Sequence, residues 1–150
     1  MKQFKEWNVK PYYGPEIVGI MLEELVARKN KVEKMEKAKM RWSLFAMGCA
    51  AIFFLFGYKA FGNVGMSNNI LNVLLGSPLI LVLLLLLSIG FIQLNFFVKK
   101  TTKAEKEFDE LREELISRST ELWETDDTWE SREAVYSFMK REHDINLYHK

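Results

Sequence analysis

Two uncharged apolar stretches decide the fold of this chain: WSLFAMGCAAIFFLFGY at residues 42–58 and SPLILVLLLLLSIGFIQLNFFV at residues 77–98. A helix needs about 20 apolar residues to cross a bilayer core of about 30 Å. The first stretch reaches that length when it is extended past Lys59 to Phe61, and the second reaches it alone. The centre of the second stretch, from Leu79 to Leu87, is entirely aliphatic, which is rare in a helix of a soluble core.

The boundaries of the second stretch favour a helix that starts there. Ser77 is a good N-cap, and Pro78 suits the first helical position because its missing N–H has no partner there. We therefore expect an all-α chain built on an integral membrane helical hairpin. Its transmembrane helices cover residues 42–61 and 77–98, and a short extracytoplasmic loop covers residues 62–76.

Basic residues flank both stretches on their outer sides, whereas Lys59 alone lies between them. The positive-inside rule places such basic flanks in the cytoplasm. We therefore expect a multi-pass protein of the cell membrane with both termini cytoplasmic, and the lipid bilayer as its first partner. The flanking residues are Arg28, Lys29, Lys31, Lys34, Lys37, Lys39 and Arg41 before the first stretch, and Lys99, Lys100, Lys103 and Lys106 after the second.

Small residues occur at helical spacing in the first stretch. Ala46 and Ala50 are four residues apart, and Gly57 falls near the same stripe. Small side chains let two helix backbones approach closely in lipid. Two interpretations are open: packing against the second span of the same chain, or a dimerisation face.

Both stretches are expected to continue as long cytoplasmic helices. Residues 1–41 form a tail and a basic helix that starts near Pro15, and residues 99–123 have the heptad-type spacing of a coiled coil. The two arms match in length and have opposite charge, which favours antiparallel pairing within one chain. Pairing of each arm with its copy in a dimer is the alternative. The residues expected at the seam of this stalk are Val18, Leu25, Val32, Phe108, Leu111 and Leu115.

Residues 124–150 are expected to form a short amphipathic helix and a tail. Asp127 and Glu130 have the spacing of a capping box, which predicts a helix over Thr128–Glu142. Further aromatic residues, among them Phe4, Trp7, Tyr12 and Tyr13, lie near the N-terminus. The aromatic residues either form the core of a small cytoplasmic knob or dock a protein partner, for which the candidates are Trp129, Tyr136 and Met139.

No catalytic, cofactor-binding or metal-binding set is recognisable in the sequence. The two histidines, His143 and His149, match no metal-ligand spacing, and Cys49, the single cysteine, lies inside an apolar stretch. The net charge of +1 gives no basic field for nucleic acid. Charged residues are also absent from the interior of both stretches, which disfavours a proton or ion path.

Two segments, KAEKEFDELREELISRSTELW at residues 103–123 and WESREAVYSFMKREHDINLYHK at residues 129–150, accompany the charged leader and the two apolar stretches. In this combination the chain resembles an uncharacterised family of small two-span membrane proteins of Bacillus-type bacteria. The resemblance covers most of the chain. It implies a location in the cytoplasmic membrane and supplies no activity, ligand or catalytic residue.

The sequence thus predicts a non-enzymatic protein: a membrane-anchored scaffold, adaptor or regulatory protein that presents cytoplasmic helices to a protein partner or to a second copy. The alternative is a pore-forming or small transport-type homo-oligomer.

Overall fold

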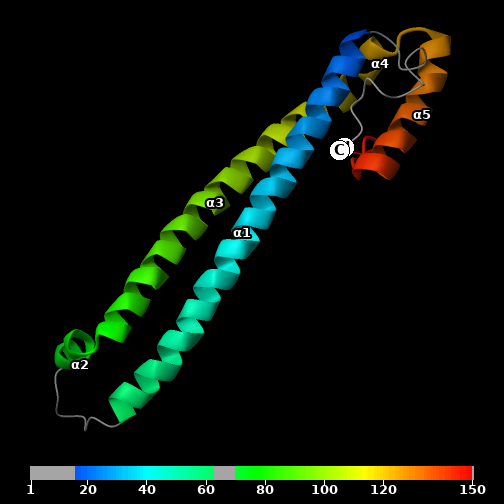
Figure 1. Cartoon of the computed structure of the whole chain (residues 1–150). Helices are drawn as coiled ribbons and strands as arrows, with labels where there is room; N and C mark the ends of the chain where they lie inside the picture. Colours follow the sequence, from blue (N-terminus) through cyan, green and yellow to red (C-terminus); the bar gives the residue numbers. More distant parts are fainter. Residues whose placement is uncertain (1–15, 63–69, 150) are drawn as a thin grey trace. The chain divides into compact units, whose positions relative to one another are not determined.

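The computed structural model describes residues 16–62 and 70–149, and these residues form five helices. In chain order they are α1 (Glu16–Gly62), α2 (Ile70–Gly76), α3 (Pro78–Ser117), α4 (Ser119–Leu122) and α5 (Asp126–His143) (Figure 1). No strand occurs in this part of the chain, so the predicted all-α class is confirmed. The aromatic residues near the N-terminus, and residues 63–69 of the predicted loop at 62–76, lie outside the described residues. Residues 70–76 of that predicted loop are helical and form α2.

The chain divides into two compact units, and both long helices contribute to each. The apolar unit comprises Met35–Thr101, and the polar unit comprises Met1–Lys34 together with Thr102–Lys150. The apolar unit therefore holds the second half of α1, all of α2 and the first half of α3. The polar unit holds the remaining halves of α1 and α3 with α4 and α5.

The long helices bury one narrow stripe each. On α3 the buried and half-buried residues recur at alternating spacings of three and four from the first turns to the last. A repeat of 3.5 residues keeps one seam of a helix against its neighbour. The seam residues of α3 are Ile80, Leu83, Leu87, Gly90, Leu94, Phe97, Thr101, Ala104, Phe108, Leu111 and Leu115.

The apolar unit leaves most of its side chains uncovered. Both α1 and α3 contain a stretch of 18 residues that is long and apolar enough to cross a membrane. Only 17% of each stretch is buried. Large exposed side chains surround the seam on both helices, among them Leu44, Met47, Ile52, Phe54, Leu55, Leu85, Phe91 and Ile92.

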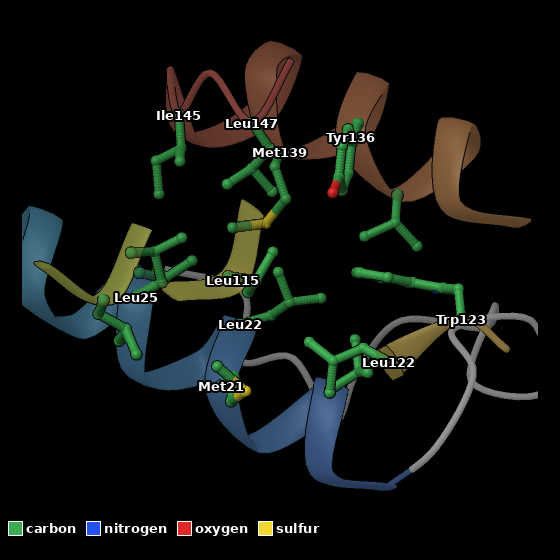
Figure 2. Packing of buried hydrophobic residues seen from close by; sticks show 14 residues of the cluster. Met21, Leu22, Leu25, Leu115, Leu122, Trp123, Tyr136, Met139, Ile145 and Leu147 are labelled. Carbon is green, nitrogen blue, oxygen red and sulfur yellow. The ribbon is translucent and has the colours of Figure 1, made fainter. Parts of the chain in front are cut away.

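The polar unit has a closed hydrophobic core, and every helical segment of the unit contributes to it (Figure 2). Leu22 and Leu25 of α1 face Leu115 of α3, and Met139 of α5 reaches the same centre (Figure 2). The full cluster is Val18, Met21, Leu22, Leu25, Val26, Leu111, Leu115, Leu122, Trp123, Val135, Tyr136, Met139, Ile145 and Leu147. Burial of this many large apolar side chains stabilises the unit, because each contributes about 1.5–3 kcal/mol relative to exposure.

The second long helix ends earlier than the sequence predicts. α3 stops at Ser117 and the chain turns at Arg118, whereas the expected helix continues to residue 123. The turn lets Leu122 and Trp123, which are 4% and 1% exposed, enter the core. Hydrogen bonds from Arg118 to Glu121 and Glu114 raise the pKa of its guanidinium and hold the turn.

Both ends of α5 differ from the predicted ones. The helix starts at Asp126, and the capping box joins Thr125 to Thr128 rather than Asp127 to Glu130. At the other end Asp144 has a left-handed backbone with φ of 54°. The N–H groups of Asp144 and Ile145 donate to the carbonyls of Lys140 and Met139, both at 3.1 Å. The bond from Asp144 to Lys140 is that of an αL cap, and the left-handed residue turns the tail back onto the core.

Candidate functional site

The side chains that could perform chemistry are dispersed. Among residues 16–62 and 70–149, no group of three or more His, Cys, Asp and Glu could hold a metal ion. Cys49 is buried in the apolar unit, far along the sequence from either histidine. The candidate sites in this part of the chain are therefore packing and contact surfaces.

The predicted packing stripe of the apolar unit lies partly in the seam. Ala46 and Gly57 are buried, and Ala50 is half-buried. Ala46 meets Gly90 of α3: a Cβ added at Gly90 would lie 3.5 Å from the Ala46 Cβ and 3.3 Å from the Phe45 Cδ1. The stripe therefore contacts α3 of the same chain at Ala46, whereas Gly57 has a carbon of Phe61 as its nearest neighbour.

Gly90 is a packing residue that the sequence interpretation missed. The signal was present, because the four-and-three spacing of Ala104, Phe108 and Leu111 reaches Gly90 when it is continued backwards through Thr101. A Cβ at position 90 would require the Phe45 ring to shift by a few tenths of an ångström, and a residue without a Cβ lets the two backbones approach without that shift. The hydroxyl of Thr101, buried in the same seam, donates to the carbonyl of Phe97 at 2.8 Å and is thereby satisfied.

Five of the six predicted stalk residues are buried in the polar unit, and the sixth, Phe108, is half-buried. Val18, Leu25, Leu111 and Leu115 belong to its core cluster, and Phe108 packs against that cluster. Val32 is buried as well, outside the cluster. The core cluster thus joins Val18 and Leu25 of α1 to Leu111 and Leu115 of α3, and pairing between two copies is not tested by a single chain.

Charged side chains of α1 reach across to α3 beside this seam. The Arg28 guanidinium donates to the Glu107 carbonyl at 2.6 Å and also pairs with Glu24. Lys31 lies 3.5 Å from the Glu107 carboxylate, and the Lys29 ammonium lies 5.7 Å from the centre of the Phe108 ring. These contacts set the register of α1 against α3, although exposed ion pairs of this kind contribute at most about 1 kcal/mol each.

The three predicted docking residues separate into two groups. Met139 is fully buried and Tyr136 is 5% exposed, so both belong to the core and not to an accessible surface. Trp129 is 40% exposed. The reason is geometric: Tyr136 and Met139 face α1 and α3 across the core, whereas Trp129 lies in the first turn of α5.

Trp129 is held by a cation–π contact. The Arg132 guanidinium lies 3.6 Å from the centre of the Trp129 ring and 5.5 Å from the centre of the Tyr136 ring. Tyr136 also makes edge-to-face ring contacts with Tyr148 and Trp123, at centroid distances of 5.5 and 5.7 Å. Arg132, Glu133 and Tyr148 also line a pocket of about 400 Å³, together with Ile116, Ser119, Tyr136 and Leu147. The polar unit therefore presents a small aromatic and basic surface at Trp129 and Arg132.

The C-terminal tail is fastened to α3. Arg112 donates to the carbonyls of Asn146 and His149 at 3.0 and 2.8 Å. Ile145 and Leu147 alternate with exposed residues and are each 1% exposed, as an extended segment with one buried side would be. The tail is thus part of the core and not a free extension.

Two titratable groups of the polar unit are shifted by burial. Burial raises the pKa of Tyr136, while the charge of Arg132 and the Ser119 side chain act in the opposite direction. Burial lowers the pKa of His143, and the charge of Glu142 opposes this shift. Both shifts follow from loss of solvent, which disfavours the charged form.

Comparison with known proteins identifies the family of this chain and a relative. Residues 21–150 match the family described as "Protein of unknown function (DUF2663)". The chain is 32% identical over 145 residues to the "Uncharacterized protein YpbF" of Bacillus subtilis (strain 168), and the match covers 95% of each chain. No solved structure matches the chain. The chain therefore belongs to the DUF2663 family, an uncharacterised family with a member in Bacillus subtilis.

Proposed function

We propose that this protein is a non-enzymatic membrane adaptor or scaffold. In this proposal α1 and α3 cross the cell membrane as a hairpin, and the polar unit stands in the cytoplasm and binds a protein partner. The exposure of the apolar stretches is the observation that supports the membrane location. The two 18-residue apolar stretches are only 17% buried, whereas a core helix of a soluble protein is mostly buried.

The charge pattern supports the orientation. Basic residues dominate the parts of α1 and α3 next to the apolar stretches, and Lys59 is the single charge between those stretches. Cytoplasmic flanks of membrane helices carry this excess of Lys and Arg. The polar unit and both termini are then on the cytoplasmic side.

The adaptor role is supported by the construction of the polar unit. Its core is closed by its own helices and tail, so α5 needs no partner for folding. The Trp129 and Arg132 side chains are outside that core, and aromatic residues and arginine dominate the energetics of many protein interfaces. We infer that this surface contacts the partner.

The structure gives less support to a pore-forming homo-oligomer. That hypothesis depended on Ala46, Ala50 and Gly57 as a face for self-association. Ala46 is instead in contact with Gly90 of its own chain, so part of the face is already occupied. We therefore retain the adaptor as the proposed function.

In-cell cross-linking tests the adaptor role. A photoreactive residue in place of Ser137, which is exposed on α5, should capture one specific protein in cells that carry the otherwise unchanged chain. Trp129→Ala should abolish this capture, and the matched control Glu130→Ala, at an exposed neighbouring position, should retain it. Equal capture by both variants would contradict docking through Trp129.

A further inference from the structure

The apolar unit carries a group of cations that its own acidic residues do not balance. Within Met35–Thr101 the sequence has six basic residues and one acidic residue, Glu36. One cation, Lys59, is at the far end of α1. The other five are Lys37, Lys39, Arg41, Lys99 and Lys100, and we call them the cation layer.

The two halves of the cation layer lie at the same level of the unit. The contact of Ala46 with Gly90 sets which residues of α1 and α3 are opposite one another. Lys37 and Lys99 are each nine residues from that contact, in the direction of the polar unit. Since both helices advance about 1.5 Å per residue, Lys37 and Lys99 are level with each other.

These cations differ from several of the basic residues farther along the same helices. Lys31, Lys103 and Lys106 all pair with carboxylates, through Glu107 or Glu110. No residue of the cation layer forms an ion pair within the described part of the chain. Four of its five members are exposed, and Lys39 is half-buried.

Aromatic rings lie directly beside the cation layer on its apolar side. The Lys100 ammonium is 4.5 Å from the centre of the Phe96 ring, and Phe96 makes an edge contact with Phe97. On α1 the Trp42 ring, next to Arg41, packs edge-on against Phe45. Aromatic rings of this kind occupy the headgroup level of a bilayer, so the membrane location proposed above would put the cations at the depth of the lipid phosphates.

We propose that the cation layer binds anionic phospholipids, and that Lys37, Lys99 and Lys100 contact the phosphates of surrounding headgroups that have no positive charge of their own. This inference rests on the membrane location proposed above. Charge complementarity supports it, because clusters of Lys and Arg next to a membrane helix attract anionic lipids. The protein would then gather such lipids around the hairpin.

Spin-labelled lipids test the site with the full-length protein in phosphatidylcholine vesicles. Electron spin resonance measures the fraction of labelled lipid held at the protein surface. We expect labelled phosphatidylglycerol to be held about fivefold more strongly than labelled phosphatidylcholine. The triple variant K37Q/K99Q/K100Q should bring this ratio close to one, and added salt should lower it in the unchanged protein.

Two control variants separate the effect of the cation layer from the effect of removing positive charge elsewhere on the protein. K103Q/K106Q removes the same kind of charge where carboxylates already pair with it, and K59Q removes a cation at the opposite end of α1; both should keep the preference. A protein that enters vesicles without preferring phosphatidylglycerol would overturn the lipid site alone. Equal loss of preference in K103Q/K106Q would overturn it as well. A protein that fails to enter vesicles would overturn the membrane location first.

Discussion

Gly90 of α3 lies against Ala46 of α1, and a Cβ at position 90 would be in van der Waals contact with the Ala46 Cβ at 3.5 Å. The same added atom would be 3.3 Å from the Phe45 ring. Within the apolar unit this contact brings the two long helices together. It joins the residue that the sequence singled out on the first helix to one that it did not single out on the second.

A large side chain at position 90 should separate the helices. We expect Gly90→Leu to lower the free energy of unfolding by about 1–3 kcal/mol, because the extra carbons have no space in the seam. Gly48→Leu is the matched control, since nothing lies within 4 Å of a Cβ at Gly48. Thermal unfolding in detergent micelles, followed by circular dichroism, measures the difference. Equal effects of the two variants would contradict the packing role of Gly90.

Met139 is buried and Trp129 is exposed on the same helix, so their replacement should affect stability to different degrees. Met139→Ala should destabilise the polar unit by about 2–5 kcal/mol, because it opens a cavity at a fully buried position. Trp129→Ala should cost about 1 kcal/mol or less, which is the scale of its cation–π contact with Arg132. Unfolding in denaturant, monitored by tryptophan fluorescence in detergent, compares the two. A larger loss for Trp129→Ala would place Trp129 in the core.

The stability of the polar unit should depend on the charge of His143. Burial lowers the pKa of this imidazole below its ordinary value of 6.5, so the fold favours the neutral form. The contribution of neutral His143 to the free energy of unfolding is therefore fully present above pH 6.5, and it is lost as the pH falls through the lowered pKa of the folded state. The melting temperature of the unchanged protein should fall more between pH 7.5 and 5.5 than that of His143→Gln. His149→Gln, at an exposed position, is the control and should behave like the unchanged protein.

Replacing the left-handed residue at the end of α5 should stabilise the protein. Asp144 combines a φ of 54° with a negative charge at a helix C-terminus, and both features are unfavourable. We expect Asp144→Gly to raise the free energy of unfolding by about 0.5–1 kcal/mol. Asp144→Asn removes the charge alone and should give a smaller gain. If Asp144→Gly were destabilising in a thermal melt, Asp144 would have a contact that its backbone conformation does not explain.

The sequence predicted the parts of the fold that depend on hydrophobic periodicity. The two apolar stretches, the buried seam residues Leu111 and Leu115 and an amphipathic helix in the C-terminal region all follow from spacing. Uninterrupted runs without proline also indicated that the helices are long. Periodicity is sufficient here because each long helix buries only one narrow stripe.

The features that sequence reasoning missed depend on the three-dimensional partner. The packing role of Gly90 depends on its contact with Ala46, which the sequence does not show. The turn at Arg118 is likewise unmarked, because no glycine or proline is present there. Tyr136 and Met139 share an amphipathic pattern with Trp129, and only the position of α1 and α3 decides which of the three is covered. The family comparison adds no activity, because the family is uncharacterised.

The central claim is that the two apolar stretches cross the membrane and leave the polar unit in the cytoplasm. Single cysteines in a Cys49→Ala background test it through a membrane-impermeant maleimide. The positions are Asn72 of α2 and Ser137 of α5, which are both exposed. We predict that Asn72→Cys is labelled in intact cells and that Ser137→Cys is labelled only after the membrane is broken. Labelling of Ser137→Cys in intact cells, or release of the protein from membranes by alkaline carbonate, would contradict the account.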